Sequence, residues 1–215
     1  MALPRKVWTI VVGGGSGSRF GRPKQYESLG DERVIDASRR VAASVSDGVV
    51  VVVPAADAER EGGVAGGATR SESVRAGLAA VPPDAEVVCV HDAARPFASP
   101  ELYARVIAAV VAGADGAVPG VPVADTIKVI DPDGAVVDTP DRSSLVAVQT
   151  PQAFRRDVLV AAHDSGAEGT DDASLVEMAG GSVVVVDGEA DNRKITVPAD
   201  LDWARDRKRT EVATS

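Results

Sequence analysis

Four short, uninterrupted runs of mainly β-branched apolar residues restrict the fold of this chain more than any other feature. They occupy residues 7–12, 49–53, 87–90 and 183–186. A strand with one solvated face alternates apolar and polar residues, whereas a strand covered on both faces is continuously apolar. We therefore expect four parallel strands, each covered by helices on both faces.

Helical patterns separate these runs. Apolar positions at three- and four-residue spacing predict one helix around residues 34–45 and another around residues 74–81. Thr69 and Glu72 have the spacing of a capping box, and Ser99-Pro100 supplies an N-cap and a first-turn proline. Because strands and helices alternate, the sequence predicts an α/β protein with a doubly wound, Rossmann-like and mostly parallel sheet.

One segment breaks this alternation. The chain has 215 residues, which fits one domain over residues 1–215. Within it, two short strand-like runs flank the turn sequence Asp131-Pro132-Asp133-Gly134. We expect a protruding β-arm over approximately residues 123–148. An isolated hairpin is only marginally stable, so the arm is expected to pack on something, such as a second subunit.

The charge balance limits the partners of the chain. Lys and Arg number 23 against 32 Asp and Glu, a formal net charge of −9, which argues against a nucleic-acid partner. No apolar stretch approaches 18 residues and no cleavable leader is recognisable, so we expect no membrane partner and a cytoplasmic protein. A small anionic ligand would need a local basic cluster or a metal ion.

A glycine-rich segment follows the first predicted strand, where doubly wound folds bind ligands. Its backbone N–H groups are able to turn inward around phosphate oxygens. It is not a P-loop, since no Gly-Lys-Ser/Thr closes it, and Ser18 replaces the last glycine of the dinucleotide fingerprint. A tight strand-to-loop turn explains a bare glycine run equally well. The candidate phosphate-binding residues are Gly13, Gly14, Gly15, Ser16 and Gly17.

Two cations follow these glycines and favour the phosphate interpretation. Arg19 offers a planar fork to phosphate oxygens and Lys24 a compact charge, while Pro23 prevents a continuous helix between them. Together they suit a triphosphate and the charge that develops during nucleotidyl transfer. A solvated basic turn is the alternative.

Two carboxylates follow predicted strands elsewhere. Asp92 ends the third run and Asp191 follows the fourth. The carboxyl ends of parallel strands build binding sites, and two carboxylates there could share one Mg²⁺ with triphosphate oxygens. Asp is also common in caps and turns, which is the alternative.

Taken in order, the motifs of this chain resemble the 2-C-methyl-D-erythritol 4-phosphate cytidylyltransferases. The resemblance covers nearly the whole chain, although that family usually carries Ala-Ala where Gly13-Gly14 stands and an apolar residue where Arg193 stands. The matching segments are the glycine loop with Arg19 and Pro23-Lys24-Gln25-Tyr26, Gly66-Gly67 with Arg70 and Ser73-Val74, His91-Asp92-Ala93-Ala94-Arg95-Pro96, Asp125-Thr126-Ile127-Lys128, Thr150-Pro151-Gln152, Thr170-Asp171-Asp172-Ala173-Ser174, and Ala190-Asp191-Asn192-Arg193-Lys194.

The resemblance implies roles for individual residues. Arg19, Lys24 and Lys194 would be catalytic, with Lys194 at the α-phosphate. Asp92 and Asp191 would be the acids on the side of a Mg²⁺ ion. The residues implied in nucleotide binding are the glycine loop (Gly13, Gly14, Gly15, Ser16, Gly17), Gly67, Ser73 and Asp92. Ser73 would help to recognise cytosine and ribose, and its alternative role is a helix-start hydroxyl.

For the second substrate, the resemblance implies Arg95, Asp125, Thr126 and Arg142. The arm carrying Arg142 would reach into a neighbouring subunit's site, which implies a homodimer. We assign no general base, because a phosphate-monoester nucleophile is already anionic. His91 and His163 are therefore expected to be structural.

The predicted activity joins CTP and 2-C-methyl-D-erythritol 4-phosphate, giving 4-diphosphocytidyl-2-C-methyl-D-erythritol and pyrophosphate. Two alternatives stay open: a cytidylyltransferase for another polyol phosphate such as ribitol 5-phosphate, and a non-catalytic nucleotide-binding relative. A nicotinamide-dependent Rossmann dehydrogenase is disfavoured by Ser18 and by two cations near the loop.

Overall fold

A single eight-stranded sheet forms the centre of the protein. The computed structural model describes residues 6–15 and 20–214, with side chains up to Thr210. The strand order is β10-β7-β11-β6-β1-β4-β5, and β12 pairs with β7. The strands are β1 (Val7–Val12), β4 (Gly48–Val53), β5 (Val64–Ala65), β6 (Val87–Asp92), β7 (Gly116–Pro122), β10 (Val146–Val148), β11 (Gln152–Arg155) and β12 (Val183–Asp187).

The sheet is mostly parallel, as predicted. β1 pairs in parallel with β4 on one side and with β6 on the other. The pairs β4 with β5 and β7 with β12 are parallel as well. β11 is antiparallel to both β6 and β7, and β10 is antiparallel to β7. β6 and β7 therefore run in the same direction, and β11 lies between them in the opposite direction.

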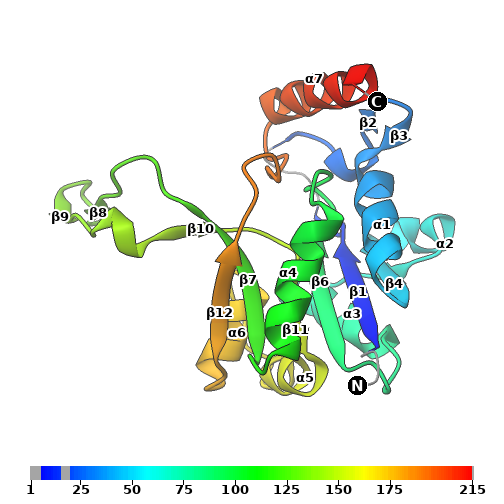
Figure 1. Ribbon diagram of the computed structural model, residues 1–215, viewed down its shortest axis with the longest axis horizontal. Coiled ribbons are helices and arrows are strands. Elements are labelled where there is room, and N and C mark those ends of the chain that lie inside the picture. The colour runs from blue at the N-terminus through cyan, green and yellow to red at the C-terminus, as the bar shows by residue number, and fades with distance from the viewer. Residues whose placement is uncertain (1–5, 16–19, 215) are drawn as a thin grey trace.

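Helices cover both faces of this sheet (Figure 1). α1 (Val34–Val45) and α4 (Pro100–Val111) share one apolar cluster with the sheet. α3 (Arg70–Ala80), α5 (Arg156–Asp164) and α6 (Asp172–Met178) share the cluster on the opposite face. The arrangement confirms the doubly wound α/β prediction. The remaining elements are η1 (Lys24–Tyr26), β2 (Ser28–Leu29), β3 (Glu32–Arg33), η2 (Ala55–Asp57), α2 (Ala58–Glu61) and α7 (Pro198–Thr214).

The predicted helix starts are confirmed. The Thr69 hydroxyl accepts a hydrogen bond from the backbone N–H of Glu72, and the Glu72 side chain accepts from the backbone of Thr69. The Ser99 hydroxyl caps α4 in the same way, with Pro100 in its first turn. Such caps satisfy backbone donors that have no partner within the helix.

The fourth apolar run was expected to be covered on both faces, and this prediction is wrong. Val184 is 38% exposed and Val185 is 54% exposed. Among the described strands, β12 pairs with β7 alone and so forms an edge of the sheet. An apolar run predicts a strand, but the number of neighbours that cover it depends on the tertiary arrangement.

The predicted arm is present and projects away from the sheet (Figure 1). β8 (Val129–Ile130) and β9 (Val136–Asp138) form a separate two-stranded antiparallel sheet, and η3 (Arg142–Ser144) leads back to β10. Gly134 has a φ of +86°, which suits glycine in the turn. Within residues 6–15 and 20–214, no helix is long and apolar enough to cross a membrane.

Candidate active site

The candidate site is a cavity of about 400 Å³ at the carboxyl ends of β1 and β6. Val12 at the end of β1 is paired with Val52 of β4 and with Asp92 of β6. β1 lies between β4 and β6, so the loop after β1 leads towards β4 and the loop after β6 leads away from it. The two loops diverge at the carboxyl ends of β1 and β6 and leave a crevice there. Of the predicted site residues, those lining the cavity are Gly13, Gly14, Gly15, Lys24, Gly67, Ser73, Asp92 and Lys194. Ser16, Gly17 and Arg19 lie outside the described residues.

Close packing limits the space beside the first two glycines of the loop. The N–H of Gly13 donates to the carbonyl of Val52 at 2.7 Å, which ties the loop to the sheet. A Cβ at Gly13 would lie 3.2 Å from the terminal methyl of Ile35, and one at Gly14 would lie 3.2 Å from Ser73 Oγ. A Cβ at Gly15 would meet nothing within 4 Å. The described part of the loop therefore follows the bottom of the cavity closely.

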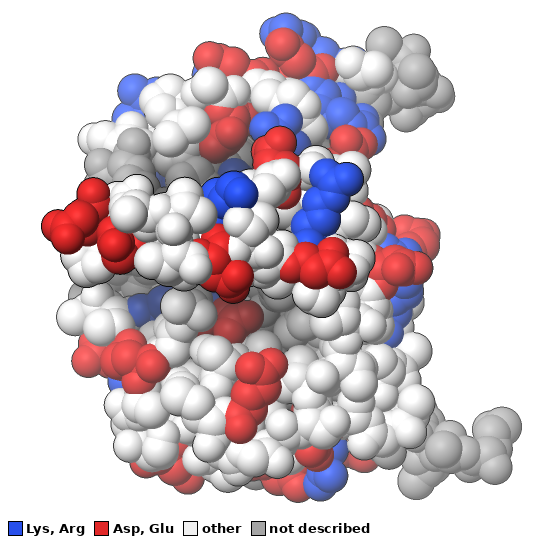
Figure 2. All heavy atoms as spheres, turned by 90° about the vertical axis from the view of Figure 1, so that its left-hand side faces the viewer, with Lys and Arg blue, Asp and Glu red and all other residues white. Residues whose placement is uncertain are grey.

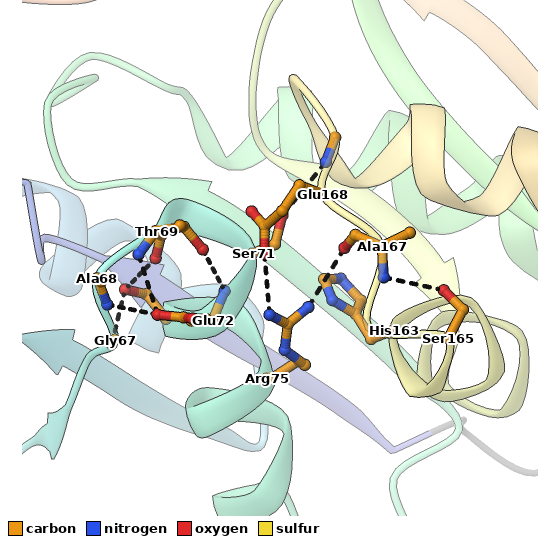
Figure 3. A network of polar contacts seen from close by, with 12 residues as sticks. Gly67, Ala68, Thr69, Ser71, Glu72, Arg75, His163, Ser165, Ala167 and Glu168 are labelled. Carbon is orange, nitrogen blue, oxygen red and sulfur yellow. Dashed lines mark hydrogen bonds and ion pairs between the residues drawn. The ribbon is translucent and has the colours of Figure 1, made fainter.

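The start of α3 forms a second wall (Figure 3). The Ser73 hydroxyl accepts from the N–H of Gly67 at 3.2 Å and donates to the Thr69 carbonyl at 2.9 Å. Glu72 accepts from the N–H of Ala68 at 2.6 Å. A Cβ at Gly67 would lie 2.3 Å from that of Glu72, so only glycine fits there. Ser73 thus shapes the wall, as its alternative role predicted, and its contact with cytosine stays a prediction.

Asp92 is the ionised group between the cations of this cavity. Its Oδ2 accepts from Lys194 Nζ at 2.7 Å, and its Oδ1 lies 3.6 Å from Arg70 Nε. Burial alone would raise the pKa of Asp92, but Lys194 and Arg70 outweigh it and hold that pKa below the usual value. The carboxylate is therefore charged whenever the protein is folded near neutral pH.

Arg70 was found in a motif but received no predicted role. Its guanidinium lies between Asp92 and the fully buried Asp172, whose Oδ2 is 2.7 Å from Arg70 Nη2. Burial opposes its charge, yet Asp172 and Asp92 together raise the pKa of Arg70 above its usual value. A signal for it existed, because a cation in the first turn of a helix is unfavourable unless acids compensate it.

The turn η1 brings Lys24 to the cavity. The buried Gln25 side chain donates to the carbonyl of Gly15 at 3.5 Å. The hydroxyl of Tyr26 donates to Asp57 at 2.8 Å, and burial together with this bond raises the pKa of Tyr26 to about 12. The contacts of the two residues after Lys24 therefore fix the turn, and Lys24 and Lys194 line one cavity.

The two predicted metal-side acids are placed differently. Asp92 lines the cavity, whereas the Asp191 side chain is 55% exposed and is paired with Arg207 Nε of α7 at 2.9 Å. Across the described residues, no cluster of three or more His, Cys, Asp or Glu side chains is arranged to hold a metal ion. This donor set fits Mg²⁺, which typically takes one or two protein carboxylates and completes its shell with phosphates and water.

The residues predicted for the second substrate lie outside this cavity. The Arg95 guanidinium donates to the carbonyl of Asn192 at 2.8 Å, next to the segment that carries Lys194. Asp125, Thr126 and Arg142 are exposed on the arm, where Arg142 Nη1 donates to the carbonyl of Ala124 at 2.9 Å. Arg142 therefore contacts the segment that carries Asp125 and Thr126, and these three residues are not part of the cavity lining.

Both histidines are buried and take part in internal hydrogen bonds, as expected for structural residues. His91 Nε2 lies 3.1 Å from the carbonyl of Arg95, and Nδ1 lies 3.1 Å from Thr150 Oγ1. A carbonyl only accepts, so Nε2 carries the proton and Nδ1 accepts from the threonine. Burial lowers the pKa of His91 to about 4. His163 contacts Asp172.

Cations on both sides of a glycine loop, with one ionised carboxylate between them, suit a nucleoside triphosphate with its metal ion. The fold and this cavity together define the class of Rossmann-like nucleotidyltransferases. The chain belongs to the 2-C-methyl-D-erythritol 4-phosphate cytidylyltransferase family, whose sequence profile matches residues 7–206.

Individual relatives agree with this assignment. The chain is 46% identical to the 2-C-methyl-D-erythritol 4-phosphate cytidylyltransferase of Frankia casuarinae, over 94% of this chain and 80% of that protein. It is 44% identical to the bifunctional enzyme IspD/IspF of Nitratidesulfovibrio vulgaris, over 91% of this chain. The match covers 56% of that longer relative.

A solved structure shares the fold as well. The 4-diphosphocytidyl-2C-methyl-D-erythritol synthase of Anaerococcus prevotii superposes with a TM-score of 0.84 at 30% identity, covering 95% of this chain and 99% of that one. The superposition includes almost the whole of both chains.

Proposed function

We propose that this chain transfers the cytidylyl group of CTP to the phosphate of 2-C-methyl-D-erythritol 4-phosphate and releases pyrophosphate. Family membership supports the reaction, and the observation that carries it is the cavity lined together by Lys24, Lys194, Asp92 and the glycine loop. The acceptor phosphate attacks the α-phosphorus, the bond to the pyrophosphate leaving group breaks, and no proton must be removed first. Catalysis then rests on positioning and on compensation of charge.

Each part of the cavity has a task in this proposal. The N–H groups of the glycine loop and Lys24 bind the β- and γ-phosphates, and Lys194 turns from Asp92 to the α-phosphate. Asp92 would hold Mg²⁺ together with the triphosphate. When bound, this ion compensates charge on the phosphate oxygens. The corresponding role of Asp191 requires its side chain to exchange Arg207 for the metal ion, and it stays a prediction.

We further propose that the arm makes a homodimer and delivers Asp125, Thr126 and Arg142 to the acceptor site of a second copy. Exposed apolar side chains on the arm support this, since such surface is usually covered in an assembly. Figure 2 looks onto the arm, beneath which the surface is hollowed, and shows Lys and Arg interspersed with Asp and Glu on this face. Such a mixed surface suits small substrates better than nucleic acid. The cytoplasmic location stays a prediction.

The test follows pyrophosphate release with CTP, MgCl₂ and 2-C-methyl-D-erythritol 4-phosphate, with ATP, GTP and UTP in place of CTP as controls. We expect release that depends on both CTP and the acceptor. A chain that releases no pyrophosphate with any nucleotide is not this enzyme.

Two alternatives are separated by the same assay. Ribitol 5-phosphate as the better acceptor would identify a relative with another polyol phosphate, because acceptor pockets discriminate by a few polar contacts. Tight CTP binding in calorimetry without pyrophosphate release would identify a non-catalytic nucleotide-binding relative.

A further inference from the structure

A line of alternating charges runs from the cavity into the helical layer behind it. Lys194 Nζ is 2.7 Å from Asp92 Oδ2, and Asp92 Oδ1 is 3.6 Å from Arg70 Nε. Arg70 Nη2 is 2.7 Å from Asp172 Oδ2, and Asp172 Oδ1 is 3.1 Å from His163 Nε2. The side chains of Lys194, Asp92 and Arg70 are 38%, 12% and 24% exposed, whereas Asp172 is fully buried.

Two members of this line lie at the starts of helices. Arg70 is the first residue of α3 and Asp172 is the first residue of α6. Arg75 of α3 donates to the carbonyl of Ala167 and pairs with Glu168 at 3.0 Å, which holds the connection between α5 and α6 against α3 (Figure 3). The neighbouring Asp171 caps α6. Asp172 is therefore presented to Arg70 by a fixed backbone.

The two oxygens of Asp92 face different cations, and this arrangement has a consequence for binding. A lysine that turns to the α-phosphate must leave Asp92, and a buried carboxylate without a partner is costly. Arg70 stays beside the other oxygen and continues to compensate Asp92. Asp172 in turn engages Arg70 Nη2, so the guanidinium, which lines the cavity, is held between two acids.

We propose that Arg70 and Asp172 are positioning residues, an inference that rests on the proposed function. They allow Lys194 to move to the nucleotide while they keep Asp92 in place and its negative charge compensated. They act through Asp92 and Lys194. Removal of the Asp172 charge alone should therefore raise nucleotide affinity and lower turnover, which loss of folding alone would not do.

The first variant is Asp172→Asn, which keeps the shape of the side chain and removes its charge. Arg70 then loses its closest acidic partner and keeps Asp92 and Asp171, so more of its positive charge acts on the triphosphate. We expect CTP to bind about threefold more tightly in EDTA by calorimetry, since charge-assisted contacts to phosphate strengthen. We expect turnover to fall by about tenfold, because Arg70 then draws Asp92 away from its place. Unchanged or weaker CTP binding in EDTA would overturn the proposal.

The second variant tests the proposal even if Asp172→Asn does not fold. Arg70→Met combined with Asp172→Leu replaces the ion pair by apolar side chains, which proteins often tolerate well. A pair needed only for stability would be replaced without loss of turnover. We expect instead that CTP binds more weakly and that turnover stays low, since Lys194 must now abandon an otherwise uncompensated Asp92. Wild-type turnover in this double variant would overturn the proposal.

The controls separate this inference from the function on which it rests. Leu159→Ala removes core packing in α5 without touching a charge, so it reports the effect of reduced stability alone. A wild-type chain that binds no CTP would refute the proposed function and this inference together. A wild-type chain that binds and turns over CTP, beside variants that merely follow Leu159→Ala, would refute this inference only.

Discussion

At the scale of the residue, the cavity is lined by charged side chains and by glycines that leave space for a ligand. Lys24 and Lys194 belong to the first kind, and Gly13, Gly14 and Gly67 to the second. The first kind is exposed to the cavity and is expected to govern rate. The second kind is packed against neighbours and is expected to govern shape and stability.

Lys24→Ala is expected to slow pyrophosphate release about 100-fold, because one preorganised cationic contact to the transition state is lost. The measurement is kcat/KM for CTP at fixed MgCl₂. Lys6→Ala is a matched control, since Lys6 is paired with Asp84 before the start of β1, at the opposite end of that strand from the cavity. Equal losses in both variants would contradict a specific role for Lys24.

Gly13→Ala is expected to raise the free energy of unfolding by about 0.4–1 kcal/mol, since alanine loses less chain entropy on folding. The backbone of Gly13 is not left-handed, and the nearest obstacle is the movable end of Ile35. Gly14→Ala serves as the contrast and should destabilise, because its Cβ meets a Ser73 hydroxyl already held by two hydrogen bonds. Urea unfolding measures both, and a loss of stability in Gly13→Ala would contradict the argument.

At the scale of the element, the arm exposes apolar side chains that its own chain does not cover. Ile130 of β8 is 60% exposed and Val137 of β9 is 61% exposed. Two short strands with exposed apolar side chains are not stable alone. The proposed homodimer supplies the missing contact, because each arm would be covered by a second copy.

The double variant Ile130→Asp with Val137→Asp is therefore expected to shift the protein from dimer to monomer in light scattering. Turnover should fall with it, since Arg142 would no longer reach a second site. Val111→Asp places the same charge on an exposed apolar position of α4 and should leave the mass unchanged. A wild-type chain that is monomeric at all concentrations would refute the dimer itself.

At the scale of the whole molecule, a buried polar network joins the sheet to the segment that carries Lys194. Thr150 Oγ1 accepts from the N–H of Asp92 and donates to His91, while the carbonyl of Thr150 accepts from the amide of Asn192. His91 in its neutral form is the only titrating member of this group beside Asp92. Stability of the fold is therefore expected to depend on its protonation.

The pKa of His91 is about 4 in the folded chain against 6.5 for an ordinary histidine. The unfolded chain binds the extra proton first, so folding stability falls as pH drops from 6.5 to 4, by about 3 kcal/mol from this group. His91→Gln should remove this slope in urea unfolding measured across that pH range. An equal slope in the variant would show that another group is responsible.

The sequence by itself determined four strands of the sheet, the starts of two helices, the arm and several residues that line the cavity beside the first strand. Continuous apolar runs are sufficient to predict strands, and the cap at Thr69 and the turn before Gly134 follow from local hydrogen bonding and backbone conformation. The motifs likewise led to the family and to Lys24, Asp92 and Lys194. These features depend on neighbours within a few residues, or on residue order alone.

The tertiary structure alone decided which groups meet across long separations. The exposure of Val184 and Val185, on opposite faces of β12, depends on which elements cover that edge of the sheet, and a local sequence pattern does not contain this information. Arg70 meets Asp172 across about a hundred residues of chain only because α3 and α6 begin at the same end of the sheet. Asp191 instead faces Arg207 of α7. Ion pairs form between charges that lie close in space. Residue order suggested that Asp191 binds a metal ion, whereas the tertiary structure pairs it with Arg207.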